Sequence, residues 1–389
     1  MIDFLKDKLE SLHRAGLYRT LRELGGPQSA TTIIDGREVL QFSSNNYLGL
    51  ANHPRLSTAA KEAIDRYGSG AGASRLAGGN LELNGKLENK IAALKKKESA
   101  LLFSTGYMAN VGILTALVDE GDVIYSDEFN HASIIDGCRM SKAETVVYPH
   151  KDMNALERLL KGSEHYAHRL IVTDGIFSME GDIAPLPDLV GVAKKYGCTL
   201  MVDDAHATGV LGTQGGGTGE HFDLWDEIDI AMGTLGKALG GFGAFVAGTH
   251  TLREFLINKA RPLIFTTGLP PAVIASGIAA LELLEDAPEL RVALWENVRF
   301  FKKGVDELGF NTGGSETQII PIVVGDASLA MQMGEMLLKE GVYMQGIRPP
   351  AVPQGFSRLR ATIMATHTKD QLKYALASME TVGKKLKII

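Results

Sequence analysis

Short apolar runs alternate with amphipathic stretches through the middle of the chain. Between residues 99 and 232 the runs are rich in branched and aromatic residues, and the segments between them carry apolar residues at helical spacing. Alternation of this kind predicts an α/β fold with a parallel, doubly wound sheet. The predicted strands are 99–103, 123–126, 144–148, 169–173, 199–202 and 228–232, and the predicted helices include 86–94, 153–160 and 189–196.

Polar motifs begin where several of these strands end. His131 follows the strand 123–126, Ser178 follows 169–173, and the sequence Asp203-Asp204-Ala205-His206 comes directly after 199–202. In an open α/β sheet, ligands bind outside the carboxyl ends of the strands. The motifs therefore predict a ligand site at this edge of the sheet.

Lys237 stands alone among small residues in the segment 233–241, just after the last predicted strand. A nucleophilic lysine must be partly desolvated, because its usual pKa of ~10.4 leaves almost no free amine at neutral pH. A solvated lysine in a glycine-rich turn would give the same pattern. The carboxylate of Asp203 at the preceding strand end favours the chemical interpretation, since pyridoxal phosphate (PLP) needs an amine, a carboxylate partner for its ring nitrogen and a phosphate site.

A candidate phosphate site lies at Ser104-Thr105-Gly106-Tyr107, where a strand leads into a helix. A glycine at a helix start offers backbone N–H groups to an anion. Simple capping of the helix by Ser104 or Thr105 would look the same in the sequence.

The segment 68–80 has five glycines and one arginine, Arg75, and predicts a long loop of functional importance. It is not a nucleotide-binding P-loop, because the nearby Gly85-Lys86 is followed by Leu87 rather than Ser or Thr. No strand–GxGxxG–helix unit is present either, which argues against a nicotinamide-dependent oxidoreductase.

The two ends of the chain have their own patterns. Residues 2–24 predict an amphipathic helix that must pack against something, for which a second subunit is one candidate, and 33–42 predicts a hairpin around Asp35-Gly36. Helical patterns dominate beyond residue 248, and a second α/β region starts near 317. We therefore expect an N-terminal segment (1–50), a large domain (51–289) and a small C-terminal domain (290–389).

Composition narrows the class of protein. The chain has 389 residues, 45% hydrophobic and 22% charged, with a net charge of −6, so no nucleic-acid or membrane surface is expected. The weakly polar run 264–284 contains Pro270, Pro271 and Glu282, which favours a buried helix over a membrane span. Two cysteines without metal-site spacing and no secretory pattern at the start predict a cytoplasmic protein and no metal site.

Three motifs together carry a family resemblance. With Asn130-His131-Ala132-Ser133, Asp203-Asp204-Ala205-His206 and Thr234-Leu235-Gly236-Lys237 in this order, the chain resembles the α-oxoamine synthases, PLP-dependent enzymes of the aspartate-aminotransferase fold. The resemblance extends from the turn at 45–50 to the strand around Arg358-Leu359-Arg360. It implies a large domain with a mostly parallel seven-stranded sheet flanked by helices and a smaller C-terminal α/β domain.

The resemblance also implies roles for individual residues. Lys237 would form the Schiff base with PLP, Asp203 would pair with the ring nitrogen and His131 would stack on the ring, while His206 and Ser178 would lie near the ring hydroxyl. The phosphate would be held by Thr105, Gly106, Tyr107 and Thr234, with Thr266 and Thr267 contributed by the neighbouring subunit of a homodimer with shared active sites.

The implied reaction is a decarboxylative condensation of an amino acid with an acyl thioester. Gly70 to Leu76 and Ile347-Arg348-Pro349-Pro350 resemble the branch of the family that joins L-alanine to pimeloyl-CoA or pimeloyl-ACP in biotin biosynthesis. Asn84 departs from the histidine of many relatives. The expected substrate contacts are Arg19, Asn45, Arg75, Arg348 and Arg360, with Arg360 on the amino acid carboxylate.

Two alternatives remain open beside this branch. A sister enzyme would use glycine and acetyl-CoA with the same machinery, because that machinery does not itself read the acyl chain. The second alternative is a protein of the PLP fold that binds as a regulatory or scaffold subunit and catalyses no reaction. The intact Lys237 argues against this alternative.

Overall fold

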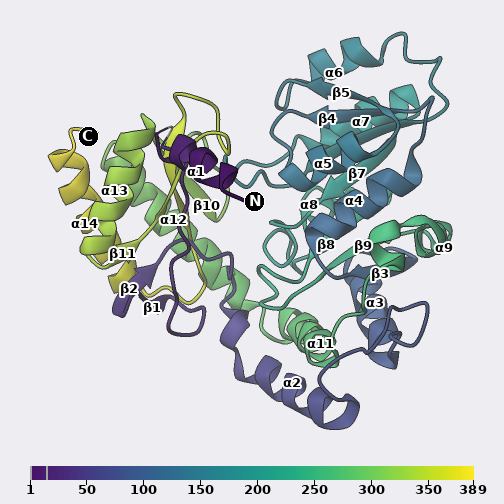
Figure 1. Cartoon of the computed structure of the whole chain (residues 1–389), viewed down its shortest axis with the longest axis horizontal. Helices are drawn as coiled ribbons and strands as arrows, with labels where there is room; N and C mark the ends of the chain where they lie inside the picture. Colours follow the sequence, from purple (N-terminus) through teal and green to yellow (C-terminus); the bar gives the residue numbers. More distant parts are fainter. Residues whose placement is uncertain (1, 15) are drawn as a thin grey trace.

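The computed structural model describes residues 2–14 and 16–389 and has two lobes (Figure 1). The larger lobe is built on a seven-stranded sheet with the order β3-β9-β8-β7-β6-β4-β5. All neighbours pair in parallel except β9, which is antiparallel to both β3 and β8. The strands are β3 (Ser99–Phe103), β4 (Val123–Asp127), β5 (Glu144–Tyr148), β6 (Arg169–Asp174), β7 (Thr199–Asp203), β8 (Ile230–Thr234) and β9 (Ala244–Gly248).

This sheet confirms the predicted fold class, including the seven strands that the family resemblance implies, and it contains one strand that the apolar runs did not mark. The six predicted strands are all present, with ends within two residues of those expected. The seventh is β9, which returns antiparallel from β8 through a glycine-rich turn, without a crossover helix. The predicted helix–strand alternation could not mark it, because only parallel neighbours need a crossover.

Helices cover both faces of the sheet, and the alternation of side chains along each strand separates two cores. On β3, Leu101 and Phe103 belong to one buried cluster with α4, α5 and α9, whereas Ala100 and Leu102 belong to the other with α3, α7 and α11. The helices of this lobe are α2 (Pro54–Tyr67), α3 (Glu82–Leu94), α4 (Gly106–Leu117), α5 (Ala132–Met140), α6 (Met153–Leu160), α7 (Leu186–Tyr196), α8 (Thr218–His221), α9 (His250–Lys259), α10 (Arg261–Ile264) and α11 (Pro271–Asp286). Short 3-10 turns lie at Leu50–Asn52 and Trp225–Glu227.

The smaller lobe contains the C-terminal part of the chain together with an early hairpin. β2 pairs with β1 around the predicted turn at Asp35-Gly36 and in parallel with β11, so residues from both ends of the chain share one sheet. α12 begins at Glu289, one residue before the predicted start of the small domain at 290, and the three-part division of the chain stays a prediction. The elements are β1 (Thr31–Ile34), β2 (Arg37–Gln41), α12 (Glu289–Glu307), β10 (Ile319–Gly325), α13 (Ala327–Lys339), β11 (Val342–Tyr343), β12 (Gln345–Ile347), β13 (Ser357–Thr362) and α14 (Lys369–Lys385).

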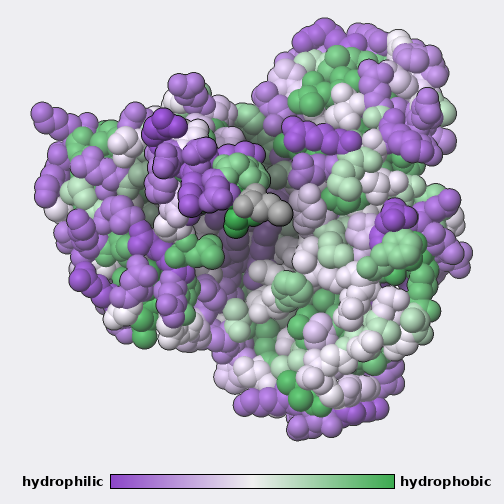
Figure 2. Space-filling model, viewed as in Figure 1, coloured by the Kyte–Doolittle hydropathy of each residue, from purple (hydrophilic) through white to green (hydrophobic). Residues whose placement is uncertain are grey.

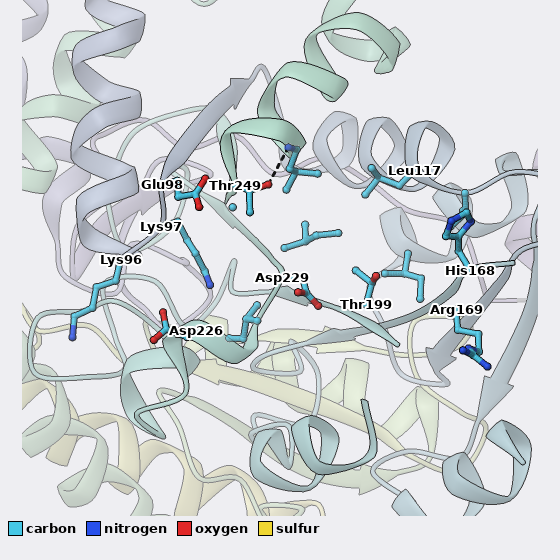
Figure 3. Close-up of a pocket in the computed structure, with 16 residues that line it drawn as sticks. Lys96, Lys97, Glu98, Leu117, His168, Arg169, Thr199, Asp226, Asp229 and Thr249 are labelled. Carbon is cyan, nitrogen blue, oxygen red and sulfur yellow. Dashed lines mark hydrogen bonds between the residues drawn. The ribbon is translucent and has the colours of Figure 1, made fainter. Parts of the chain in front are cut away.

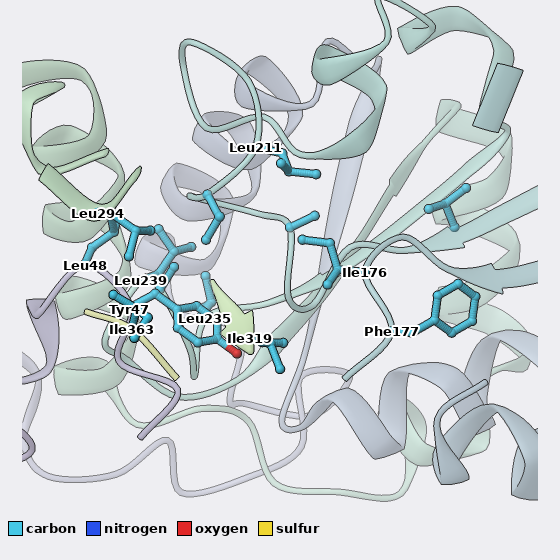
Figure 4. Packing of buried hydrophobic residues seen from close by; sticks show 14 of the residues in the cluster. Tyr47, Leu48, Ile176, Phe177, Leu211, Leu235, Leu239, Leu294, Ile319 and Ile363 are labelled. Atoms are coloured by element: carbon cyan, nitrogen blue, oxygen red, sulfur yellow. The ribbon is translucent and has the colours of Figure 1, made fainter. Parts of the chain in front are cut away.

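One continuous core joins the lobes. Leu294 of α12 and Ile319 of β10 belong to the same buried cluster as Leu235 and Leu239, which follow β8 (Figure 4). The surface is nevertheless hollowed between the lobes (Figure 2). The junction is therefore packed at its base, which fixes the position of one lobe relative to the other.

The first helix, α1 (Phe4–Arg14), is shorter than the predicted range 2–24. Gly16 adopts a left-handed conformation with φ of 66° just beyond it, which ends the helical path. None of the residues of α1 is buried, and Phe4, Leu9 and Leu12 are exposed. Among the described residues, no helix combines the length and the apolar character that a membrane span requires.

A buried ion pair ties α3 to the end of β7. Lys95, at the C-terminus of α3, donates from Nζ to Asp204 Oδ2 at 2.8 Å and to the carbonyl of Gly216 at 2.8 Å. Asp204 also accepts from the Thr218 hydroxyl at 2.6 Å. The side chains of Lys95 and Asp204 are 2% and 3% exposed, so each charge depends on the other.

We predict that Lys95→Met destabilises the fold by about 3–5 kcal/mol, because Asp204 would remain buried without its counter-charge. Urea unfolding followed by circular dichroism measures this loss. The matched control is Lys96→Met, which changes an exposed neighbour that lies over the Trp225 ring and should cost less than about 1 kcal/mol. Equal losses in the two variants would contradict the prediction.

Candidate active site

Lys237 lies three positions beyond the end of β8 and is partly buried. Desolvation lowers the pKa of its amine to about 8, with Arg360 acting in the same direction and the carboxylates of Asp203 and Asp174 opposing it. A lysine in this state has an appreciable fraction of free amine near neutral pH. The structure therefore supports the predicted desolvation of Lys237, although Gly236 and Phe242 of the same turn are exposed.

Two carboxylates lie side by side next to this lysine. Asp174 ends β6 and Asp203 ends β7, and the two residues are register partners. Asp203 accepts from Asn110 Nδ2 at 2.8 Å and from the backbone N–H of Ala205 at 2.9 Å. Asp174 accepts from the backbone N–H of His131 at 2.8 Å, and burial together with the charge of Asp203 raises the pKa of Asp174 well above its usual value.

The two predicted histidines have different surroundings. His206 is buried, and its Nδ1 lies 2.7 Å from the hydroxyl of Tyr47. Burial lowers the pKa of His206 well below its usual value, with further lowering by Lys237 and Arg360. His131 lies at the start of α5 with its ring nitrogen in partly buried contacts, and desolvation lowers its pKa, with Lys237 acting in the same direction and Asp203 opposing it. Both imidazoles are thus neutral near pH 7.

Arg360 brings the small lobe to the site. It lies on β13, is buried, and donates from Nε to the carbonyl of Ser178 at 2.6 Å and from Nη1 to Asn45 Oδ1 at 3.2 Å. Asn45 also accepts from Tyr47, whose hydroxyl contacts His206. The predicted residues Asn45, Ser178, His206 and Arg360 therefore form one contact network, although their roles stay a prediction.

A second pair of contacts anchors the loop that carries Ser178. Arg358 donates to the carbonyl of Met179 at 2.9 Å and to Glu180 Oε1 at 3.2 Å. The Thr317 hydroxyl donates to the carbonyl of Gly181 at 2.8 Å. Gly181 has a φ of 71°, and a Cβ there would lie 2.0 Å from the carbonyl of Ile319. The loop is thus held tightly against the small lobe.

The predicted phosphate site is the N-terminus of α4. Thr105 caps the helix by accepting from the N–H of Met108 at 3.1 Å, so the capping interpretation is correct for this residue. The backbone N–H groups of Gly106 and Tyr107 donate to none of the described residues and remain available for an anion. The Tyr107 hydroxyl turns away to Asp136, so only its backbone can serve there.

Thr234 is already engaged within its own turn. Its hydroxyl donates to the carbonyl of Gly243 at 2.8 Å and accepts from the N–H of Gly236 at 3.1 Å. These bonds hold the backbone between β8 and Lys237 in place. An additional contact of this hydroxyl with phosphate stays a prediction.

The contacts of the other predicted residues are with other parts of the chain than Lys237. Arg75 pairs with the buried Glu88 and with Asn80, which stabilises the glycine-rich loop. Arg19 and Arg348 line a pocket of about 430 Å³ between the N-terminal segment and the small lobe, where Arg348 donates to the Tyr18 carbonyl. Thr266 and Thr267 lie beside Arg75 and Ser104.

Another pocket, of about 460 Å³, lies at the opposite edge of the sheet (Figure 3). Its lining includes the first residues of β6, β7 and β8, and several of its polar groups have protein partners. Asp229 accepts from the N–H of Leu200, and Glu98 accepts from the N–H of His250. The ionisable residues around Lys237 are not part of this pocket, so we place the candidate active site at the carboxyl edge.

Sequence patterns did not single out three residues of the site. Asp174 could be recognised in the sequence as a carboxylate at a strand end, but no sequence feature indicated that it lies next to Asp203. Tyr47 lies in a polar turn, and its contact with His206 spans 159 positions. Asn110 is the only amide side chain in α4, and a lone polar residue on a buried helix is a usable signal.

Known proteins resemble this chain over nearly its whole length. The family model for aminotransferase class I and II matches residues 37–379. A relative from Geobacter sulfurreducens named 8-amino-7-oxononanoate synthase is 54% identical over 98% of this chain and 98% of its own. A relative with the same name from Symbiobacterium thermophilum is 51% identical over 100% of both chains.

Solved structures show the same fold. A serine palmitoyltransferase from S. paucimobilis with a bound PLP–myriocin aldimine superimposes with a TM-score of 0.94 at 34% identity, covering 100% of this chain and 98% of that one. An 8-amino-7-oxononanoate synthase from Francisella tularensis has a TM-score of 0.78 at 30% identity, covering 90% of this chain and 99% of that one.

The residues present fit PLP, the cofactor of these enzymes. A lysine with a lowered pKa, a buried carboxylate and free N–H groups at a helix start supply the amine, the ring-nitrogen partner and the phosphate site that PLP requires. The Ser178 hydroxyl donates to none of the described residues, which leaves it available as well.

We predict that PLP labels Lys237 with a pH midpoint near 8. The free amine is the reactive form, and the pKa of Lys237 is about 8, whereas lysines in water titrate near ~10.4. Protein freed of cofactor would be mixed with PLP between about pH 6 and 9, reduced with borohydride and mapped by peptide mass spectrometry. Lys237→Ala is the control, and a dominant label on another lysine of the wild-type chain would refute the assignment.

Proposed function

We propose that this chain, which belongs to the aminotransferase class I and II family, catalyses the decarboxylative condensation of L-alanine with a pimeloyl thioester. The products are 8-amino-7-oxononanoate, carbon dioxide and the free thiol, as in biotin biosynthesis. The observation that carries this proposal is the set of nearly full-length relatives, 45–55% identical, that are named 8-amino-7-oxononanoate synthase. It favours this reaction over the condensation of glycine with acetyl-CoA.

Lys237 is the proposed general base. PLP, when bound, supplies an electron sink that stabilises negative charge on the α-carbon of the amino acid. Once the Lys237 amine is no longer bonded to the cofactor, it can remove the α-proton of the amino acid and afterwards return a proton to the same carbon. Its pKa of about 8 suits both steps, because a general base works best when its pKa lies close to the pH of the reaction.

Asp203 is the proposed partner of the cofactor ring nitrogen. Its Oδ2 and Oδ1 each accept one hydrogen bond from the protein, and each oxygen has a further lone pair. A carboxylate there favours the protonated ring, since a hydrogen bond to a charged group contributes ~1.5–3 kcal/mol. His131 would cover one face of the ring, and His206 and Ser178 would contact its hydroxyl.

Arg360 is the proposed binding group for the carboxylate of alanine. Its Nε and Nη1 are held by Ser178 and Asn45, while Nη2 donates to none of the described residues. The guanidinium is thus oriented by the protein and still has N–H groups to offer to a carboxylate. Arg19 and Arg348 would meet the far end of the acyl chain from the pocket that they share.

The active enzyme is proposed to be a homodimer with shared sites. Thr267 is exposed, and Thr266 lies beside it on the segment that follows α10, so both can approach a second chain. The apolar residues Phe4, Leu9 and Leu12 of α1 lack a buried contact within one chain, and they offer additional surface for a partner.

We also propose a cytoplasmic location. The two cysteines, Cys138 and Cys198, are free thiols, and burial raises the pKa of each to about 11. Thiols in this state are protonated and unreactive, which is consistent with a reducing compartment.

We predict that purified enzyme with PLP releases carbon dioxide and free thiol in equal amounts from L-alanine and pimeloyl-CoA. Glycine with acetyl-CoA should turn over at least about tenfold more slowly, because a pocket shaped for the longer chain loses apolar contact with the short one. Product analysis by mass spectrometry measures both reactions. A faster reaction with glycine and acetyl-CoA would overturn the substrate assignment while leaving the role of Lys237 intact.

We further predict that two inactive chains complement each other. Lys237→Ala removes the base from one site, and Thr267→Ala with Thr266→Ala removes the phosphate contacts given to the neighbouring site. Mixed dimers should contain one site with neither defect and regain activity, whereas homodimers of either variant should not. Absence of recovery in purified mixed dimers would rule out this sharing of residues.

A further inference from the structure

Four side chains beside Lys237 form one hydrogen-bonded chain. Asn110 Nδ2 lies 2.8 Å from Asp203 Oδ2 and 2.8 Å from Ser133 Oγ. Ser133 Oγ in turn lies 2.7 Å from Nδ1 of His131. Asn110 and Ser133 are both 1% exposed, so these contacts are shielded from water.

The direction of each hydrogen bond in this chain follows from the available protons. Asp203 lies beside the amide of Asn110, and an ionised carboxylate can only accept, so Nδ2 rather than Oδ1 of Asn110 must face it. The second proton of Nδ2 then goes to Ser133 Oγ. Because Ser133 Oγ accepts there, its own proton is free to be donated to Nδ1 of His131.

A second donor meets the same nitrogen of His131. His131 is the N-cap of α5, and its Nδ1 accepts from the backbone N–H of Ser133 at 3.2 Å. Nδ1 thus faces two donors from one residue. A ring nitrogen that carries a proton could accept from neither, so both donors favour the tautomer in which Nδ1 keeps its lone pair.

The amide of Asn110 acts in these contacts as a donor only. Its Oδ1 is buried and has no hydrogen-bond partner among the described residues. A buried acceptor without a partner is unfavourable for folding. The two N–H groups of the Asn110 amide link Asp203 to Ser133.

We propose that Asn110 and Ser133 are positioning residues that hold His131 as the tautomer with its proton on Nε2. This inference rests on the proposed function for the importance of His131, and it adds two residues to the machinery. In this tautomer Nε2–H is the only ring donor, so His131 can offer a hydrogen bond toward the cofactor and substrate but cannot accept one there.

The charges around His131 are consistent with a neutral ring. Lys237 and Asp203 act on it in opposite directions, and His206 and the carboxyl of Asp174, which is bonded to its backbone N–H, also face this region. A donor to Nδ1 favours the neutral form over the protonated one. Removing the Ser133 hydroxyl should therefore raise the pKa of His131.

The test is nitrogen NMR of protein labelled with 15N in the histidine rings and freed of cofactor, with His131 assigned by its absence in His131→Gln. At about pH 8, above the usual histidine pKa, wild-type Nδ1 should give a pyridine-type signal and Nε2 a pyrrole-type signal. In Ser133→Ala the hydroxyl donor to Nδ1 is lost while the backbone N–H donor remains, so the population with the proton on Nδ1 should increase and the pKa of His131 should rise. Ser133→Thr should restore both. Ser133→Cys keeps the volume with a poor donor and serves if Ser133→Ala does not fold.

Controls and kinetics separate this inference from the substrate assignment. Ser141→Ala removes a hydroxyl at the other end of α5, where it donates to the Cys138 carbonyl, and should leave the His131 signals unchanged. Asn110→Ala should shift them in the same direction as Ser133→Ala, by less. In the loaded enzyme, Ser133→Ala should lower kcat about fivefold, with KM for the amino acid changed by less than about twofold.

Two results would overturn the inference. One is a wild-type His131 with the proton on Nδ1, and the other is an unchanged His131 signal in Ser133→Ala or Ser133→Cys. Both results are NMR observations on protein without substrate. A failure of the alanine and pimeloyl assignment would therefore leave the NMR result unaffected, and the reverse also holds.

Discussion

The withdrawal of Asp174, Asp203 and Lys237 from water is the constraint on which the rest of the site depends. Desolvation disfavours every charged form, so it frees the lysine amine and at the same time requires each carboxylate to find hydrogen bonds. Asn110, the N–H of Ala205 and the N–H of His131 supply those bonds. The placement of α4 and α5 against the sheet is thus tied to the same charges that do the chemistry.

Adjacent positions at the end of β7 show how the fold divides its carboxylates between two tasks. Asp203 acts on the charge of Lys237 and accepts from Asn110, whereas Asp204 is paired with Lys95 and with the hydroxyl of Thr218. The period of two along a strand sends neighbouring side chains to opposite faces. One carboxylate is therefore available to a ligand, and the other holds α3 and α8 to the sheet.

The strands and most of the reactive positions could be predicted from the sequence, because each depends on a local pattern. An apolar run followed by Asp203 or by the turn around Lys237 marks a strand end whatever the rest of the chain does. β9 could not be recognised in this way, since it pairs antiparallel with β8 and no helix separates the two strands in the sequence. The pairing of Arg75 with Glu88 and the contact of Tyr47 with His206 were also hidden, because they join segments whose proximity only the folded chain decides.

The loop that carries Ser178 has a mechanical consequence. Arg358, Arg360 and Thr317 of the small lobe all donate to its backbone carbonyls, and Gly181 leaves no gap against Ile319. These bonds join the small lobe to a loop of the large lobe that follows β6, so they oppose a rotation of the small lobe that would leave the loop behind. Arg360 and Ser178 are therefore coupled directly across the junction of the lobes, and any movement of the small lobe for substrate entry must either break these bonds or carry the loop along.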